Sequence, residues 1–284
     1  MAMKLDALFL SEIVPFAVII GVICARRWYA KKKRIRCASS EKLLRPAGYT
    51  LSCQLNDLWI NLLTWLMGIV CASILSSTYA ATLPNPIFTI FFLALTSGIL
   101  VVLALRTFSE IENVRQGLHG EQIMGEYLQN LIAQGYKVFH DIPGDGKWNV
   151  DHVVVGPAGV FVIETKTKSK KPSRTKQPEH EVIVDGQTLR FPYYTDKKAL
   201  EQARMNAVWV GKWLSKATGE PVTAQAIVAL PGWMVKQTAP AKDVWVMNVK
   251  GVPKNITSCS KRLSESAIGK IAYQLDQRCR DVQF

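Results

Sequence analysis

NVDHVVVGPAGVFVIETK, residues 149–166, is the stretch that determines the fold of the C-terminal half of the chain. Two runs rich in β-branched and aromatic residues flank a GPAG segment, a pattern that predicts two antiparallel strands joined by a short loop. In such a hairpin Val155 would lie opposite Val160. This pairing sets the register of both strands and therefore decides which side chains share a face.

Three polar side chains of this hairpin are expected to meet. In this register Asp151 lies opposite Glu164, and Lys166 shares the face of Glu164 because alternate residues of a strand do so. Strands this apolar are normally buried, and a buried carboxylate pair beside a lysine is unfavourable unless something compensates the charge. A divalent cation would compensate it, and carboxylate oxygens suit Mg²⁺, or alternatively Mn²⁺. We therefore expect a metal site on Asp151 and Glu164, with Lys166 available to stabilise charge on a phosphate.

The arrangement of Asp151 and Glu164-x-Lys166 on adjacent strands resembles the PD-(D/E)xK nuclease superfamily. More closely, the C-terminal half resembles the nuclease-related domain family, called NERD, over roughly residues 115–235. Outside the hairpin the resemblance rests on Gly120, Glu121, Gly135, Tyr136 and Gln202. It implies an α/β fold with a restriction-endonuclease-like central mixed sheet flanked by helices, and metal-dependent phosphodiester cleavage.

The resemblance also implies a role for each matching residue. Asp151 and Glu164 would be metal ligands, Lys166 the catalytic lysine, Glu121 the helix carboxylate, and Gln202 the glutamine on the helix after the core strands. Glu126 competes with Glu121 because glycine precedes both. We favour Glu121, whose distance to Gly135-Tyr136 fits the family pattern better.

Elsewhere in this half, periodicity and turn signals predict the remaining elements. The expected helices are 109–134, 197–216 and 264–280, with Gly135 ending the first and Ser264 capping the last. The expected strands are 136–139, 150–155, 160–166, 181–184, 187–191, 224–230 and 244–249, and Asp185-Gly186 is expected to turn between the fourth and fifth. This order predicts an α/β or α+β domain with a central sheet.

The N-terminal part has a different composition. Residues 58–105 contain no Asp, Glu, Lys, Arg or His, which is not expected of a soluble domain. We expect membrane spans at about 7–25, 58–82 and 87–105, with the Pro84-Asn85-Pro86 segment breaking the last two apart. The chain would then divide into a membrane anchor, residues 1–106, and a soluble domain, residues 107–284. The alternative is that these segments are buried helices of a large soluble core.

The distribution of positive charge predicts the topology. A basic cluster between Arg26 and Arg36 follows the first apolar run, which argues against a cleaved signal peptide and places that end in the cytoplasm. A helical hairpin returns to the side on which it began. We therefore expect a multi-pass membrane protein with a cytoplasmic C-terminal domain and its N-terminus outside.

Overall charge and residue types limit the partners. A net charge of +13 favours polyanions, either nucleic acid or acidic lipid. Beside the proposed site, a basic stretch offers phosphate-binding candidates: Lys168, Lys170, Lys171, Arg174 and Lys176. We expect nucleic acid, with DNA favoured over RNA, and the membrane as partners, and no small-molecule cofactor. The six cysteines form no C-x-x-C pair and indicate neither a disulfide framework nor a zinc site.

Three functions remain open at this point. The first is a metal-dependent nuclease tethered to the membrane. The second is a module of the same fold that binds nucleic acid or protein without cleaving it, and the third is a membrane scaffold whose basic loops hold acidic lipid. Two other features have structural interpretations: His152 should point to the opposite sheet face from Asp151, and Trp209 with Trp213 should line a core-facing helix side.

Overall fold

A computed structural model of the protein describes residues 21–22, 25, 28–29, 41–79, 86–146, 148–172, 177–239, 241 and 243–282. The chain divides into two compact units, one containing Leu58–Ser109 and the other containing Lys42–Asp57 and Glu110–Gln283. The predicted span 7–25 lies almost wholly outside the described residues, as do Arg174 and Lys176.

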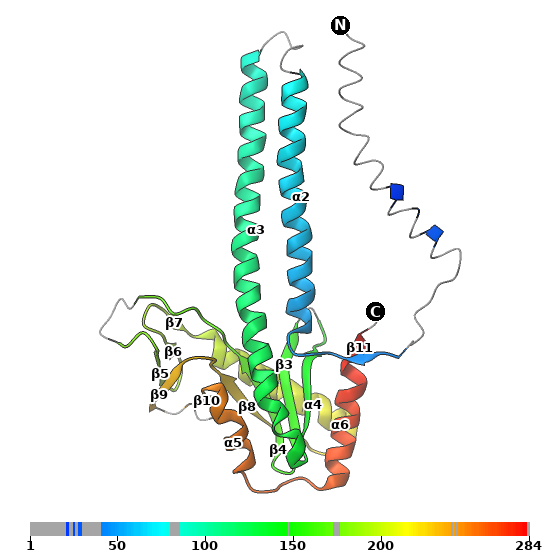
Figure 1. The fold of residues 1–284 in the computed structure, drawn as a ribbon. Helices are drawn as coiled ribbons and strands as arrows, with labels where there is room; N and C mark the ends of the chain where they lie inside the picture. The colour runs from blue at the N-terminus through cyan, green and yellow to red at the C-terminus, as the bar shows by residue number, and fades with distance from the viewer. Residues whose placement is uncertain are drawn as a thin grey trace. The chain divides into compact units, whose positions relative to one another are not determined.

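Two long helices account for most of the described part of the first unit (Figure 1). They are α2, Tyr49–Tyr79, and α3, Pro86–Gln129, and both continue into the second unit. Both are long and apolar enough to cross a membrane, yet only 11% and 17% of their most apolar windows is buried. Most of each apolar window is therefore not buried in the core of the described structure. A Cβ atom on Gly68 would lie 3.4 Å from Leu100 Cδ1, so the helices pack closely where the glycine sits.

The helices in this region extend beyond the expected segments at two places. The predicted span 87–105 and the predicted helix 109–134 form one continuous helix, α3, because nothing between them breaks the backbone. The change from apolar to charged residues at Arg106 marks a change of surroundings and not a change of secondary structure. At the other boundary, α2 begins at Tyr49 rather than Leu58, directly after Gly48, whose φ of +75° ends the preceding turn.

The second unit is built on a five-stranded mixed sheet of order β10-β8-β4-β3-β2. β2, β3 and β4 are antiparallel neighbours, whereas β8 runs parallel to both β4 and β10. The bounds are β2 Lys137–Pro143, β3 Asn149–Gly156, β4 Gly159–Thr165, β8 Ala224–Ala229 and β10 Val244–Met247. This confirms the expected α/β class with a central mixed sheet.

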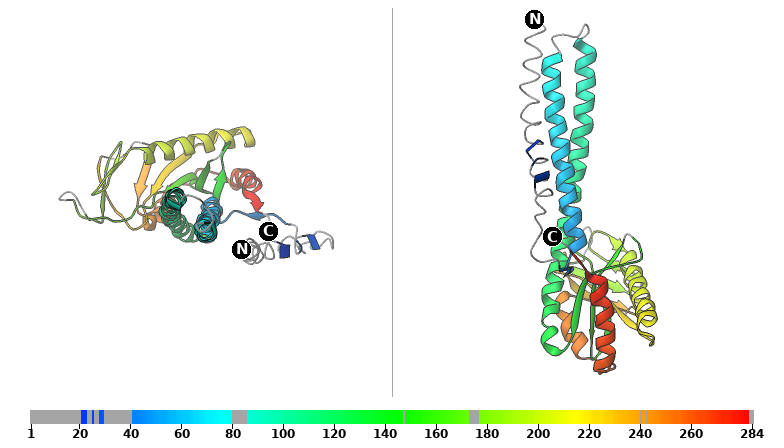
Figure 2. Two further views of the ribbon diagram at one scale, coloured as in Figure 1. Left: turned by 90° about the horizontal axis from the view of Figure 1, so that it is seen from above. Right: turned by 90° about the vertical axis from the view of Figure 1, so that its right-hand side faces the viewer.

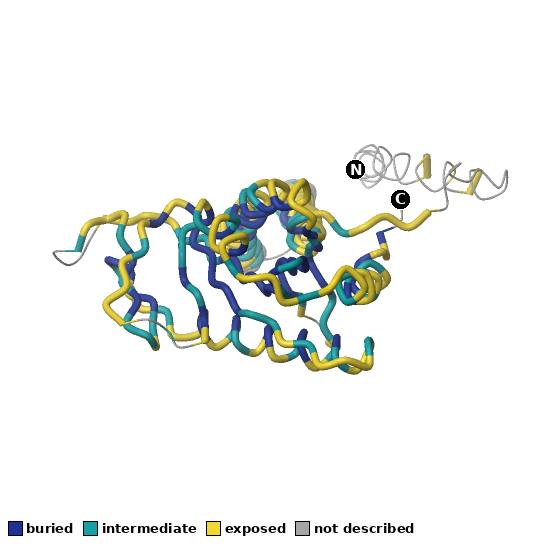
Figure 3. The backbone as a smooth tube through the Cα atoms, turned by 90° about the horizontal axis from the view of Figure 1, so that it is seen from below, coloured by how far each residue is buried: buried dark blue, intermediate teal, exposed yellow. Residues whose placement is uncertain are grey.

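Helices cover both faces of this sheet (Figure 2). One face packs against α4, Lys198–Thr218, and α6, Glu265–Cys279, through side chains such as Leu214 and Leu275. The other face packs against the end of α3 and against α5, Val252–Thr257, through side chains such as Met124 and Ile256. Figure 3 shows the buried strands running between the more exposed flanking helices.

Several sequence signals act locally as expected. The Val155–Val160 pair is formed, so the hairpin register is confirmed. Gly135 has a φ of +84° and follows η1, Ile132–Gln134, although α3 itself ends earlier, at Gln129. Ser264 caps α6 by accepting a hydrogen bond from the Ala267 N–H at 3.3 Å.

The sequence did not indicate a second, four-stranded sheet of order β7-β6-β5-β9. Its strands are β5 Glu181–Asp185, β6 Leu189–Arg190, β7 Thr195–Asp196 and β9 Met234–Ala239. The expected Asp185-Gly186 turn joins β5 to β6, with Gly186 at a φ of +87°. β9 was not predicted because its residues are mostly exposed and lack the apolar alternation of a half-buried strand.

Candidate active site

The antiparallel β3–β4 hairpin positions the expected acidic pair. Its register continues from the His152–Ile163 pair and places Asp151 opposite Glu164 at the end of the sheet where β4 finishes. Both carboxylates lie on the face covered by α4, because Val153 and Val162 of the same face belong to the core that α4 completes. Asp151 and Glu164 are buried, and Lys166 follows immediately after β4.

Glu164 is held by side chains from its own strand and from α4. Lys166 Nζ lies 2.7 Å from Glu164 Oε1, and Asn206 Nδ2 donates a hydrogen bond of 2.9 Å to Glu164 Oε2. Lys166 Nζ also donates to Gln202 Oε1 at 2.9 Å. Gln202 and Asn206 are four residues apart, so they project from one side of α4 toward the end of β4.

Asn206 is a site residue that sequence reasoning missed. It is buried although it is polar, and its amide faces a carboxylate that the sequence had singled out. The available signal was its spacing from Gln202 on a predicted amphipathic helix, where a polar residue interrupts the apolar side.

Asp151 and Glu164 strongly influence each other. Burial raises the pKa of Asp151 well above its usual range, and repulsion from Glu164 and Glu121 raises it further. Burial also raises the pKa of Glu164, although Lys166 and Asn206 counteract part of that effect. Burial alone would lower the pKa of Lys166, but attraction to Glu164 outweighs it and the pKa is raised. The lysine is therefore a cation inside a cluster that is rich in carboxylates.

Glu121 reaches this region from α3. It is buried, and its charge affects the pKa of Asp151, whereas Glu126 is exposed. Gly120 explains how α3 comes so near: a Cβ atom there would lie 1.6 Å from Thr167 Oγ1, so only glycine permits this approach to the segment after β4. Of the two glutamates, the structure thus brings Glu121 to the site.

Several buried oxygens in this region have no hydrogen-bond partner among the described residues. They are Glu121 Oε2, Thr165 Oγ1 and Thr167 Oγ1. A buried polar atom without a partner is unfavourable, and such atoms in a native site indicate a missing polar occupant. Oxygen atoms of this kind, like those of Asp151 and Glu164, are the ligands that hard cations prefer.

The carboxylate oxygens nevertheless already have partners within the protein. Both oxygens of Glu164 have partners, and Asp151 Oδ2 accepts a 2.7 Å hydrogen bond from the Thr165 N–H. Among the described residues, no group of three or more His, Cys, Asp or Glu side chains stands ready to hold a metal ion. Carboxylate oxygens are ligands that a divalent cation accepts, and a cation at Glu164 would compete with Lys166 for Oε1.

A segment far from the hairpin in sequence adjoins the site. Asp141 of β2 is fully buried with a φ of +51°, and it accepts hydrogen bonds from Thr50 Oγ1 at 2.7 Å and Arg45 Nη1 at 3.2 Å. Arg45 also contacts Asp281 at 2.6 Å, next to the small β1–β11 sheet of Leu43–Leu44 and Arg280–Val282. The residues just before and at the start of α2 are therefore part of the second unit, which the sequence did not indicate.

The basic stretch after β4 lies over aromatic rings. Lys168 Nζ is 5.4 Å from the centroid of the Tyr194 ring, Lys170 Nζ is 5.9 Å from that of Trp233, and Lys171 Nζ is 5.8 Å from that of Tyr193. The Trp233 Nε1–H donates a 3.3 Å hydrogen bond to the Lys168 backbone oxygen. Cation–π contacts of this kind hold the described lysines in defined places beside Lys166.

Two features that the sequence analysis interpreted as structural, His152 and the Trp209–Trp213 pair, are arranged as expected. His152 points away from Asp151, is fully buried, and shares a 2.8 Å Nδ1–Nδ1 contact with His140. Trp209 and Trp213 pack against the core and stack on each other at 5.6 Å between ring centroids, and Arg278 covers both. Neither feature contributes to the site.

These observations define the class of protein: a mixed α/β domain, compatible with a nuclease-like fold, that follows two long apolar helices. Residues 116–231 match the NERD family model, described as a nuclease-related domain. The match supports the NERD family for this part of the chain and a nuclease-related function. No curated protein and no solved structure gives a significant match.

Proposed function

We propose that the protein is a membrane-anchored nuclease that hydrolyses phosphodiester bonds with the help of Mg²⁺ or Mn²⁺ on the cytoplasmic face. The observation that supports this most strongly is the buried cluster of Asp151, Glu164 and Lys166 at the end of β4, with Gln202 and Asn206 holding it from α4. The membrane location is supported by the length and exposed apolar surface of α2 and α3.

Each residue of the cluster has a distinct part in the proposed reaction. Asp151 and Glu164 would hold the cation, with Glu121 nearby, and the cation would polarise the phosphate and favour ionisation of a water. Lys166 would move from Glu164 to the phosphate and stabilise the charge that develops there. Gln202 orients Lys166 through its Oε1, and Asn206 keeps the Glu164 carboxylate in place.

Binding of the nucleic-acid backbone is assigned to the basic stretch that follows Lys166. Lys168, Lys170 and Lys171 lie over aromatic rings, and the same stretch contains Arg174 and Lys176. Phosphate contacts of this type give affinity without sequence preference and weaken as salt is raised.

One observation favours a second candidate, a module of the same fold that binds nucleic acid or protein without cleaving it. Lys166 and Asn206 already occupy both oxygens of Glu164, so the cluster can exist as a closed network. A purely structural network of this kind needs no cation, and this difference separates the two candidates experimentally.

Cleavage assays on the detergent-purified full-length chain test the proposal. We expect degradation of DNA or RNA oligonucleotides in Mg²⁺ or Mn²⁺, no degradation in EDTA, and recovery when the metal is restored. Single-stranded and duplex DNA and RNA should be compared. Activity that survives EDTA contradicts a metal-dependent mechanism, and binding without cleavage under every condition favours the binding module.

The topology leads to a separate prediction. Reporter domains fused after Phe284 should report the cytoplasm and be protected from protease added outside intact cells, whereas reporters at Met1 should report the outside. This follows from the basic cluster before α2 and the even number of expected spans after it. A cytoplasmic N-terminus would remove the expected span at 7–25.

A further inference from the structure

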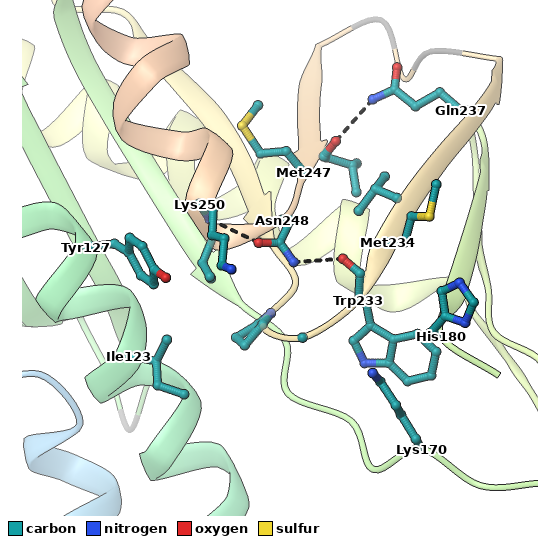
Figure 4. Close-up of a pocket in the computed structure, with 15 residues that line it drawn as sticks. Ile123, Tyr127, Lys170, His180, Trp233, Met234, Gln237, Met247, Asn248 and Lys250 are labelled. Atoms are coloured by element: carbon teal, nitrogen blue, oxygen red, sulfur yellow. Dashed lines mark hydrogen bonds between the residues drawn. The ribbon is translucent and has the colours of Figure 1, made fainter.

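A groove of about 840 Å³ opens beside the basic stretch, and neither Asp151 nor Glu164 lines it (Figure 4). Its walls come from α3, from the turn that leads into β9, and from the segment after β10. The volume falls within the range of roughly 300–1,000 Å³ that is typical of pockets for drug-sized ligands. Of its lining residues, only Lys170 has a part in the proposed function, as a phosphate contact.

The groove combines apolar walls with a basic rim. Tyr127, Met234 and Met247 supply aromatic and thioether surface, while Lys170 and Lys250 supply positive charge. Among the described residues that line it, none is Asp or Glu. A pocket with a largely apolar lining and positive charge at its rim is complementary to a base joined to a phosphate.

The walls are held in place by hydrogen bonds. Asn248 Nδ2 donates to the Trp233 backbone oxygen at 2.8 Å, and Asn248 Oδ1 accepts from the Lys250 N–H at 3.1 Å (Figure 4). These bonds tie the turn before β9 to η2, Val249–Gly251. The groove is therefore formed before any ligand arrives, which reduces the entropy lost on binding.

Lys170 connects the groove to the active site. It lines the groove, lies over Trp233, and follows Lys166 by four residues, which span at most about 14 Å of backbone. A strand whose phosphate lies at Lys166 can therefore follow Lys168 and Lys170 into the groove. The bases of a duplex are stacked and paired inside the helix, so only an unpaired nucleotide can place its base there.

We propose that this groove binds an unpaired nucleotide of the substrate strand, with its base against the apolar wall that includes Met234 and its phosphate at the basic rim of Lys170 and Lys250. The inference rests on the proposed nuclease function and deepens it, because it makes single-stranded nucleic acid the preferred substrate class. The groove then acts as a subsite that selects single strands and orients them toward Lys166.

The inference is tested by measuring how tightly the protein binds nucleic acid under conditions in which no cleavage is needed. Fluorescence anisotropy in EDTA compares a labelled 20-nucleotide single-stranded DNA, the same sequence as RNA, and the corresponding blunt DNA duplex, using the full-length chain in detergent. To test the contribution of positive charge, we compare the groove variant Lys250→Ala with the control variant Lys254→Ala. Both lysines are exposed and lie one helical turn apart, but only Lys250 lines the groove.

To test the contribution of the apolar wall, we compare the groove variant Met234→Glu with the control variant Met205→Glu. Met234 is 56% exposed and lines the groove, whereas Met205 is 65% exposed and lies on α4. At 0.1 M salt we expect Lys250→Ala to weaken single-strand binding about fivefold, as the loss of one phosphate contact does. Met234→Glu should weaken it about tenfold or more, because it removes a base contact and adds a negative charge. The two control variants should bind as the wild type does.

Three results would overturn the inference: equal effects of Lys250→Ala and Lys254→Ala, equal losses for duplex and single strand, or unchanged binding by both groove variants. These outcomes are independent of the cleavage assay. If the groove variants bind less tightly but the wild type never cleaves, the groove proposal is supported and the nuclease proposal is contradicted. If the wild type cleaves but the groove variants bind as tightly as it does, the nuclease proposal is supported and the groove proposal is contradicted.

Discussion

Glu164→Gln is expected to abolish metal-dependent cleavage, with a loss of at least roughly a thousandfold in the single-turnover rate. The variant keeps the shape of the side chain, and its one carbonyl oxygen can still accept from Lys166 while its amide NH2 donates to Asn206 once the Asn206 amide has turned over. It removes the negative charge that a hard cation requires. Asp151→Asn should act in the same way. Calorimetric titration with Mn²⁺ should show weakened metal binding in both variants while the melting temperature stays close to that of the wild type.

The two glutamates of α3 provide a matched control for this prediction. Glu121→Gln should reduce cleavage because Glu121 is buried near Asp151, whereas Glu126→Gln should not, because Glu126 is exposed. Asn206→Ala should give an intermediate loss, since it removes a positioning hydrogen bond and no charge. Full activity in both Glu164→Gln and Asp151→Asn would mean that the carboxylate pair is structural.

Lys166→Ala is expected to abolish cleavage while leaving metal binding largely intact, because a cation does not ligate a cation. Removing one group that stabilises charge in the transition state typically reduces the rate by about a hundredfold to a thousandfold. The loss should appear at saturating substrate, in the rate of the chemical step. In the same titration the affinity for Mn²⁺ should be equal to that of the wild type or higher, because Lys166 no longer competes with the cation for Glu164.

Lys168→Ala is the comparison for Lys166→Ala. Lys168 is two residues further along and lies over Tyr194, with no described contact to Glu164. Its removal should weaken nucleic-acid binding and reduce the slope of log K against log salt by about 0.7–0.9, as expected for one phosphate contact. A saturated Lys168→Ala enzyme should still cleave. If Lys166→Ala also retains full cleavage at saturation, the assignment of Lys166 is wrong.

In the proposed mechanism, the ion pair between Lys166 and Glu164 is either formed or replaced by contacts to the cation and the phosphate. Their 2.7 Å ion pair stabilises the buried carboxylate when no cation is present. Cation binding and phosphate binding would each compete for one partner of that pair. The proposed mechanism therefore requires substrate and cation to replace the lysine–carboxylate contact together.

Much of the hairpin and of the site core could be inferred from the residues alone, for a simple reason. In a strand the side chains alternate between two faces, so once Val155 pairs with Val160 the positions of Asp151, Glu164 and Lys166 follow from counting. Gly135 and Ser264 likewise act through backbone preferences that reach only a few residues. Local geometry of this kind depends on few contacts and is visible in the sequence.

Other features depend on contacts between residues that are distant in the chain, and only the tertiary structure revealed them. Asn206 reaches Glu164 across 42 positions, and Thr50 reaches Asp141 across 91. No periodicity encodes such pairings, because they arise from how α4 and the start of α2 pack against the sheet. The continuity of α3 through Arg106 was hidden for the opposite reason: a change in polarity along a helix alters what surrounds it without interrupting its backbone hydrogen bonds.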